Sequence, residues 1–95
     1  MKFEGIKISD LKAGESINGI YLLRNAELKL SSNKKNYLDI VFTDNTGNIP
    51  AKWWDANEAD YTALVPNKLY YVNARVDMWK DALQLTLNKI KLAED

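Results

Sequence analysis

Hydrophobic and polar residues alternate along most of this 95-residue chain, with the period of two that is typical of β-strands. In the clearest example, Leu38, Ile40 and Phe42 share one face of a segment whose other face carries more polar neighbours. Segments of this kind are predicted as strands, and there are five of them: residues 16–30, 37–43, 49–54, 68–79 and 83–92.

Two of these segments do not keep one parity throughout. The first is long and mostly apolar, and its alternation changes partway, so a bent strand with a bulge near Gly19 or Arg24 is predicted. In the last segment the apolar series shifts beyond Asn88, where Ile90 and Leu92 continue it. Both shifts favour strands that bend rather than a flat sheet.

Turn-forming residues separate the strands. Residues 31–36 form a polar loop, and Lys80 with Asp81 predicts a tight turn. Residues 44–48 predict a hairpin turn in which Gly47 takes a positive φ.

One helix is predicted between residues 55 and 66. Asp55 or Asn57 is the candidate N-cap, and Pro66 ends the helix. Its spacing gives a narrow apolar stripe of three residues, Tyr61, Leu64 and Val65. We expect this helix to plug one end of the sheet structure.

The resulting order, β-β-β-α-β-β, predicts an all-β domain. Five antiparallel strands with one short helix between the third and fourth match the Greek-key barrel called the OB-fold. A three-strand meander beside a separate hairpin is the alternative, but neither piece alone would bury these apolar faces. The chain, residues 1–95, is interpreted as one domain because its length suits a single core.

Composition excludes most catalytic chemistry. The chain has neither Cys nor His, so thiolate or imidazole metal sites and a Ser-His-Asp triad are impossible within it. No catalytic residue, metal or cofactor is therefore expected. There is no signal peptide and no apolar run long enough for a membrane span, so a cytoplasmic domain without membrane partners is expected.

Aromatic and basic residues suggest a binding face instead. OB barrels bind single strands across the outer face of strands two and three, by stacking bases on aromatic rings. By parity Lys52 and Trp54 point outward, and Trp54 is predicted to stack on a base rather than pack at the barrel rim. Trp53 points inward and is predicted as core, unless an early end of the strand swaps the two tryptophans.

Other residues are candidates for the same nucleic-acid interface. Their roles would be further stacking, base-edge contacts and phosphate contacts, and they are Tyr37, Trp79, Thr43, Arg24, Lys34, Lys35 and Arg75. Trp79 could instead pack on Leu83, and the basic loop could simply be solvated. Thirteen basic and thirteen acidic residues balance, so binding would depend on a local patch.

Several short runs resemble one protein family. They are Tyr37-Leu38-Asp39-Ile40, Asp44-Asn45-Thr46-Gly47-Asn48-Ile49, Ala51-Lys52-Trp53-Trp54-Asp55 and Leu83-Gln84-Leu85. In this order they are similar to the amino-terminal OB domain of YhaM-type 3′-to-5′ exoribonucleases, also called CMP-binding factors. The resemblance covers residues 8 to 92, and a looser one extends to the ssDNA-binding barrels of replication protein A.

The resemblance implies a substrate-gripping domain excised from a larger nuclease. In that family a metal-dependent HD-type hydrolase domain follows the barrel, and homo-oligomers could form through the parent protein. A chain without His cannot itself hold the HD metal site. Trp53 and Trp79 depart from the family, which more often has an aliphatic residue and a Tyr there.

The resulting hypothesis is a non-catalytic domain that binds single-stranded RNA or DNA. An alternative is a protein-interaction or oligomerisation module that uses Trp54 and Tyr71 as anchors. An enzyme with Asp44 and Asp55 as paired carboxylates is disfavoured, because turn and cap positions explain both residues.

Overall fold

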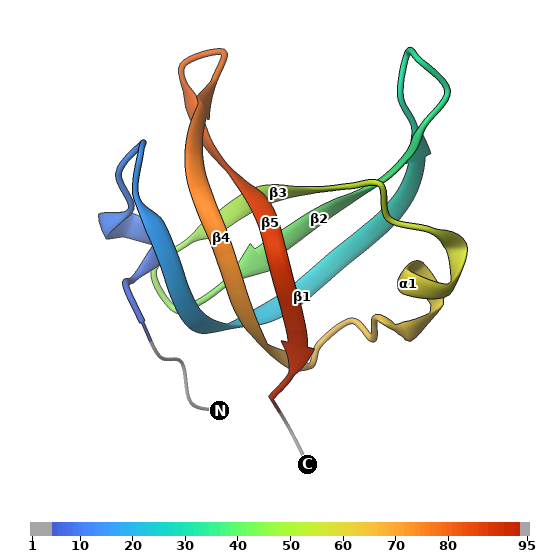
Figure 1. Cartoon of the computed structure of the whole chain (residues 1–95). Coiled ribbons are helices and arrows are strands. Elements are labelled where there is room, and N and C mark those ends of the chain that lie inside the picture. The colour runs from blue at the N-terminus through green and yellow to red at the C-terminus, as the bar shows by residue number, and fades with distance from the viewer. Residues whose placement is uncertain (1–4, 94–95) are drawn as a thin grey trace.

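Five strands and one short α-helix make up most of the computed structural model, which describes residues 5–93 (Figure 1). In chain order the strands are β1 (Ser16–Leu30), β2 (Asn36–Thr43), β3 (Asn48–Trp54), β4 (Leu69–Trp79) and β5 (Ala82–Leu92). Helix α1 (Glu58–Ala63) lies between β3 and β4, and a 3-10 helix, Ile8–Asp10, precedes β1. The predicted element order is confirmed.

The strands close into a barrel in the order β1-β2-β3-β5-β4. Strand β1 is long enough to pair with β4 through its first half and with β2 through its second half. Among the strand pairs of the described residues, only β3 and β5 run parallel, with Ala51 opposite Leu85 and Lys52 opposite Thr86. The expectation that all pairs are antiparallel is wrong here, because the chain crosses over through α1 and β4 before β5 returns beside β3.

Two bulges explain the shifts in parity. The register between β1 and β2 changes between Leu23 and Asn25, so the bulge falls at Arg24 rather than at Gly19. Between β4 and β5, Asn73 pairs with Lys89 and Ala74 with Leu87. Asn88 is therefore the extra residue, and both bulges bend the strands around the barrel.

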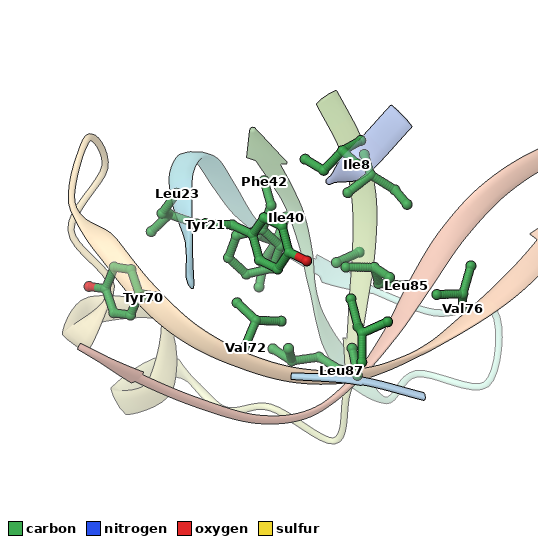
Figure 2. Close-up of a cluster of buried hydrophobic side chains, with 14 of the residues drawn as sticks. Ile8, Tyr21, Leu23, Ile40, Phe42, Tyr70, Val72, Val76, Leu85 and Leu87 are labelled. Carbon is green, nitrogen blue, oxygen red and sulfur yellow. The ribbon is translucent and has the colours of Figure 1, made fainter. Parts of the chain in front are cut away.

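The inward faces of all five strands form one hydrophobic core (Figure 2). Its most completely buried large side chains are Tyr21, Phe42, Leu23, Leu38, Ile40, Leu85, Val72 and Val76. The Tyr21 hydroxyl donates a hydrogen bond of 2.6 Å to the Ile6 carbonyl, so its polar end is satisfied. Burial and the nearby Asp44 carboxylate raise the pKa of Tyr21.

The turn between β2 and β3 is built around Asp44. Its carboxylate accepts hydrogen bonds from the backbone N–H groups of Thr46 at 2.7 Å, Gly47 at 3.2 Å and Ile8 at 2.9 Å. Among the described glycines only Gly5 and Gly14 have a positive φ, so the expectation for Gly47 is wrong. The Asp44 side chain organises the turn instead and also fixes the 3-10 helix against it.

Helix α1 is shorter than predicted. Asn57 is its N-cap, in a capping box with Asp60, and the helix ends at Ala63. No residue of α1 is buried; the neighbouring Ala56 is buried, and Leu64 packs against the core. The helix itself thus contributes no buried residue, and contact with the core comes from residues that flank it.

Candidate nucleic-acid interface

A groove of about 410 Å³ lies on the outer face of the barrel. Residues from four strands line it: Tyr37, Lys52, Trp54, Trp79 and Gln84. Figure 1 shows the β1–β2 and β4–β5 hairpins projecting to the same side of the barrel. Four of the five lining residues were predicted as site residues from the sequence.

The floor of the groove includes a pair of aromatic rings from adjacent strands. Tyr37 and Trp54 are cross-strand neighbours, with ring centroids 4.9 Å apart and an angle of 39° between the planes. Trp54 is 49% exposed, so a large part of its side chain is accessible to a ligand. Trp53 pairs with Leu38 on the inward side, where it is half-buried and packs against the core.

Trp79 lines the groove from the end of β4, which β5 separates from β3 in the barrel order. It is 60% exposed, and the Lys80 ammonium lies 5.6 Å from its ring centroid. Lys80 and Asp81 both have positive φ values, 48° and 63°, which gives the predicted tight turn. The turn directs β5 back beside β4, so that Gln84 also reaches the groove.

Asp39, which is ion-paired with the groove residue Lys52, has its charge balanced by two lysines. Asp39 Oδ1 lies 2.9 Å from Lys52 Nζ, and Asp39 Oδ2 lies 2.9 Å from Lys29 Nζ. Burial alone would raise the pKa of Asp39, but the hydrogen bonds and charges of the two lysines outweigh it and lower that pKa. Lys52 Nζ also lies 5.4 Å from the Tyr37 ring centroid.

The β1–β2 loop carries exposed cations at one end of the groove. Backbone hydrogen bonds from Ser31 to Lys35 at 2.8 Å, and from Lys34 to Ser31 at 2.9 Å, close a tight loop. Lys34 adopts a left-handed conformation with φ 63°. Within the described residues, neither Lys34 nor Lys35 has a carboxylate partner within 4.0 Å.

Five of the nine predicted site residues do not line the groove: Lys34 and Lys35 in the β1–β2 loop, and Arg24, Thr43 and Arg75 on the strands. Arg24 lies at the β1 bulge, and Thr43 donates to the Gly47 carbonyl at 2.9 Å in the far turn of β2. Arg75 on β4 is ion-paired with Asp77, with 3.1 Å between Nε and Oδ1. Thr43 and Arg75 therefore have structural partners of their own.

No binding role was predicted for Gln84, although it alternates with the apolar Leu83 and Leu85 of the last strand. Its position three residues beyond the Lys80–Asp81 turn was the available signal. The ion pairs of Asp39 with both Lys29 and Lys52 were also not predicted, because they depend on the register of three strands.

Between residues 5 and 93, no group of acidic side chains is arranged to hold a metal ion. No helix in the same range is long and apolar enough to cross a membrane.

Curated relatives of this chain are 3′-5′ exoribonucleases. The chain is 30% identical over 81 residues to 3′-5′ exoribonuclease YhaM of Oceanobacillus iheyensis, covering 85% of this chain and 26% of that protein. It is 28% identical over 88 residues to the YhaM of Bacillus subtilis, covering 93% of this chain and 27% of that protein. The chain thus spans about a quarter of the length of these relatives.

Solved structures share the fold and confirm the OB barrel. A domain of replication protein A from Methanococcus maripaludis superposes with a TM-score of 0.76, at 23% identity and 94% coverage of each chain. A chain of a replication protein A heterotrimer bound to ssDNA superposes with a TM-score of 0.67, at 14% identity, covering 96% of this chain and 73% of that one. The family model described as an OB-fold nucleic acid binding domain matches residues 17–93. This chain belongs to the family of OB-fold nucleic acid binding domains.

Proposed function

We propose that this domain binds single-stranded nucleic acid in the groove and performs no chemistry itself. Bases stack on Trp54 and Trp79, while Gln84 lies within reach of a base edge. The exposed Lys34 and Lys35 of the β1–β2 loop contact phosphates. This division matches what single-strand binding requires, namely flat rings for bases and cations for the backbone.

The observation that carries the proposal is the exposure of two tryptophans, one from β3 and one from β4, that line one groove. Large aromatic side chains gain much free energy when they are buried, yet here Trp54 is 49% and Trp79 60% exposed. Their rings are open to a planar ligand that enters between the hairpins. Bases in a duplex are already stacked on one another, so the groove suits unpaired bases.

We further propose that the domain grips substrate for a 3′-to-5′ exoribonuclease. The curated relatives that bear this name are about three times as long as this chain, which leaves room for a catalytic region such as an HD-type domain. The chain has no His or Cys with which to build such a site. Recognition would then reside in this domain and hydrolysis elsewhere.

Tryptophan fluorescence provides the test. The chain is titrated with single strands of about 12 nucleotides, RNA and DNA, and with the matching duplexes, since OB folds cover about 4–16 nucleotides. We expect saturable quenching by single strands and much weaker quenching by duplexes. Unchanged fluorescence and no binding by an independent method would reject the proposal and favour the protein-interaction alternative.

A further inference from the structure

One carboxylate holds two lysines on the binding side of the barrel. Asp39 is bonded at 2.9 Å to Lys52 through one oxygen and at 2.9 Å to Lys29 through the other. The Asp39 and Lys52 side chains are 24% and 22% exposed, and Lys29 is 43% exposed. The network is thus partly shielded from solvent, where ion pairs are screened less than at a free surface.

The strand register makes this arrangement specific. Asp39 is directly opposite Lys52 on β3, while Lys29 on β1 is opposite Tyr37, two residues before Asp39 and on the same face of β2. All these side chains lie on the outer face, next to the groove floor. An aspartate is therefore at the centre of a surface whose proposed ligand is a polyanion.

Such a residue opposes phosphate binding in two ways. Its charge repels a phosphate, and its two oxygens occupy the ammonium groups that a phosphate would otherwise contact. The pKa of Asp39 is lowered, although burial acts to raise it, because Lys52 and Lys29 bond to the ionised form. The carboxylate therefore remains charged at neutral pH.

We propose that Asp39 is an intramolecular competitor of phosphate, which keeps Lys29 and Lys52 occupied and makes the groove select bases over charge. This inference rests on the proposed function of the groove and concerns what determines its affinity. Phosphate contacts are left to the cations of the two hairpin loops. A polyanion without bases then has little to bind on the groove floor.

Replacing Asp39 should strengthen binding. In Asp39→Asn the side chain keeps its size but loses the charge that holds both lysines, and Lys29 keeps only its longer ion pair with Glu27, at 3.6 Å. For a single-stranded RNA of about 12 nucleotides we expect roughly tenfold tighter binding at low salt. The log–log salt dependence should become steeper by about 1.4, since each newly neutralised phosphate adds roughly 0.7. Inorganic polyphosphate has no bases, so the substitution should raise its affinity by a larger factor than it raises the affinity of RNA.

Matched controls separate this effect from a change in net charge. Asp10→Asn removes the same charge from the 3-10 helix, which lies at the other end of β2. We expect it to change the affinity for single-stranded RNA less than about twofold. In the double variant Asp39→Asn/Lys29→Met, about half of the gain should disappear, because one released lysine is missing. Asp39→Ser, which cannot bridge both lysines, should change affinity in the same direction as Asp39→Asn. Thermal unfolding confirms that each variant is folded.

The opposite outcome overturns the inference. If folded Asp39→Asn binds RNA as weakly as the parent chain or more weakly, Asp39 serves only to hold Lys52 beneath Tyr37. An equal gain in Asp10→Asn would also overturn it, because net charge alone would then explain the change in affinity. Failure of the proposed function is distinguishable, because then neither the parent chain nor the Asp39 variants bind single strands.

Discussion

Two adjacent tryptophans, Trp53 and Trp54, have opposite roles because side chains alternate along a strand. Trp53 faces the inside beside Leu38, and Trp54 faces outward beside Tyr37. This assignment was predictable from Ile49 and the other apolar residues of the same parity. The depth of Trp53 was not predictable: it packs at the edge of the core rather than within it.

Substituting each tryptophan should therefore affect stability differently. Trp53→Ala should lower the free energy of unfolding by about 2–3 kcal/mol, less than the 3–5 kcal/mol of a fully buried aromatic residue. Trp54→Ala, which loses mainly the contact with Tyr37, should cost less than about 1 kcal/mol. Denaturant unfolding of both variants checks this, and a larger loss for Trp54→Ala would show that the two orientations are reversed.

Asp44 should stabilise the fold in a pH-dependent manner. Burial acts to raise its pKa, but hydrogen bonds from Thr46, Ile8 and Gly47 outweigh this and lower it. A lowered pKa means that the stabilisation is present above the ordinary Asp pKa of about 3.9 and is lost as pH falls through the folded-state value.

Removing this carboxylate gives the corresponding test. Asp44→Ala should lower the free energy of unfolding by about 1–2 kcal/mol at neutral pH, because backbone N–H groups of the turn and the 3-10 helix lose their acceptor. The difference from the parent chain should shrink as pH falls below about 4. Thermal unfolding across pH measures it, with the exposed Asp10→Ala as control. A pH-independent difference would show that the charge of Asp44 is not what stabilises the turn.

At the scale of elements, the β4–β5 hairpin contains a strained turn beside the groove. Asp81 has a φ of 63°, where a side chain is disfavoured and glycine is not. Asp81→Gly should raise the free energy of unfolding by about 0.5 kcal/mol, since relief of strain exceeds the entropy that glycine adds to the unfolded chain. Thermal unfolding should then shift upward by about 2–4 °C.

Asp81→Ala is the matched control, because it removes the carboxylate but keeps a Cβ in the left-handed region. It should be no more stable than the parent chain. If Asp81→Gly and Asp81→Ala were equally stable, the backbone conformation at this position would not limit the stability of the hairpin.

Helix α1 shows where sequence patterns were insufficient. Asn57 is one of two candidate caps in the sequence, and its capping box with Asp60 confirms that choice. The apolar stripe was misleading because Tyr61 and Val65 are 39% and 46% exposed, and only Leu64 reaches the core. A helix of six residues has too few turns for its spacing to indicate what it packs against.

At the scale of the whole molecule, the order of elements was sufficient to predict the OB-fold. Alternation identified the strands, and the single helix between the third and fourth strands restricted the topology. The parallel contact of Ala51 with Leu85 closes the barrel, yet no local pattern marks it. The pairing of Asp39 with Lys29 and Lys52 was likewise hidden, since it depends on how β1, β2 and β3 are aligned.

The overall charge balance leads to a prediction about salt. With Lys52 and Lys29 held by Asp39, the cations free to meet phosphates near the groove are mainly Lys34, Lys35 and Lys80. At about 0.7 per phosphate, the log–log salt slope for single strands should be about −2 to −3. Binding isotherms at several salt concentrations measure it. A slope steeper than about −5 would indicate a much larger cationic surface.

The most direct test compares three exposed aromatic residues in one binding assay. Trp54 and Trp79 line the groove, whereas Tyr71, as exposed as Trp54 at 49%, does not. The dissociation constant for a single-stranded RNA of about 12 nucleotides should rise about 5- to 150-fold in Trp54→Ala and in Trp79→Ala, as expected for a lost stacking contact. Tyr71→Ala should bind as the parent chain does. Undiminished binding by both tryptophan variants, or a loss confined to Tyr71→Ala, would contradict the assignment of this groove as the nucleic-acid interface.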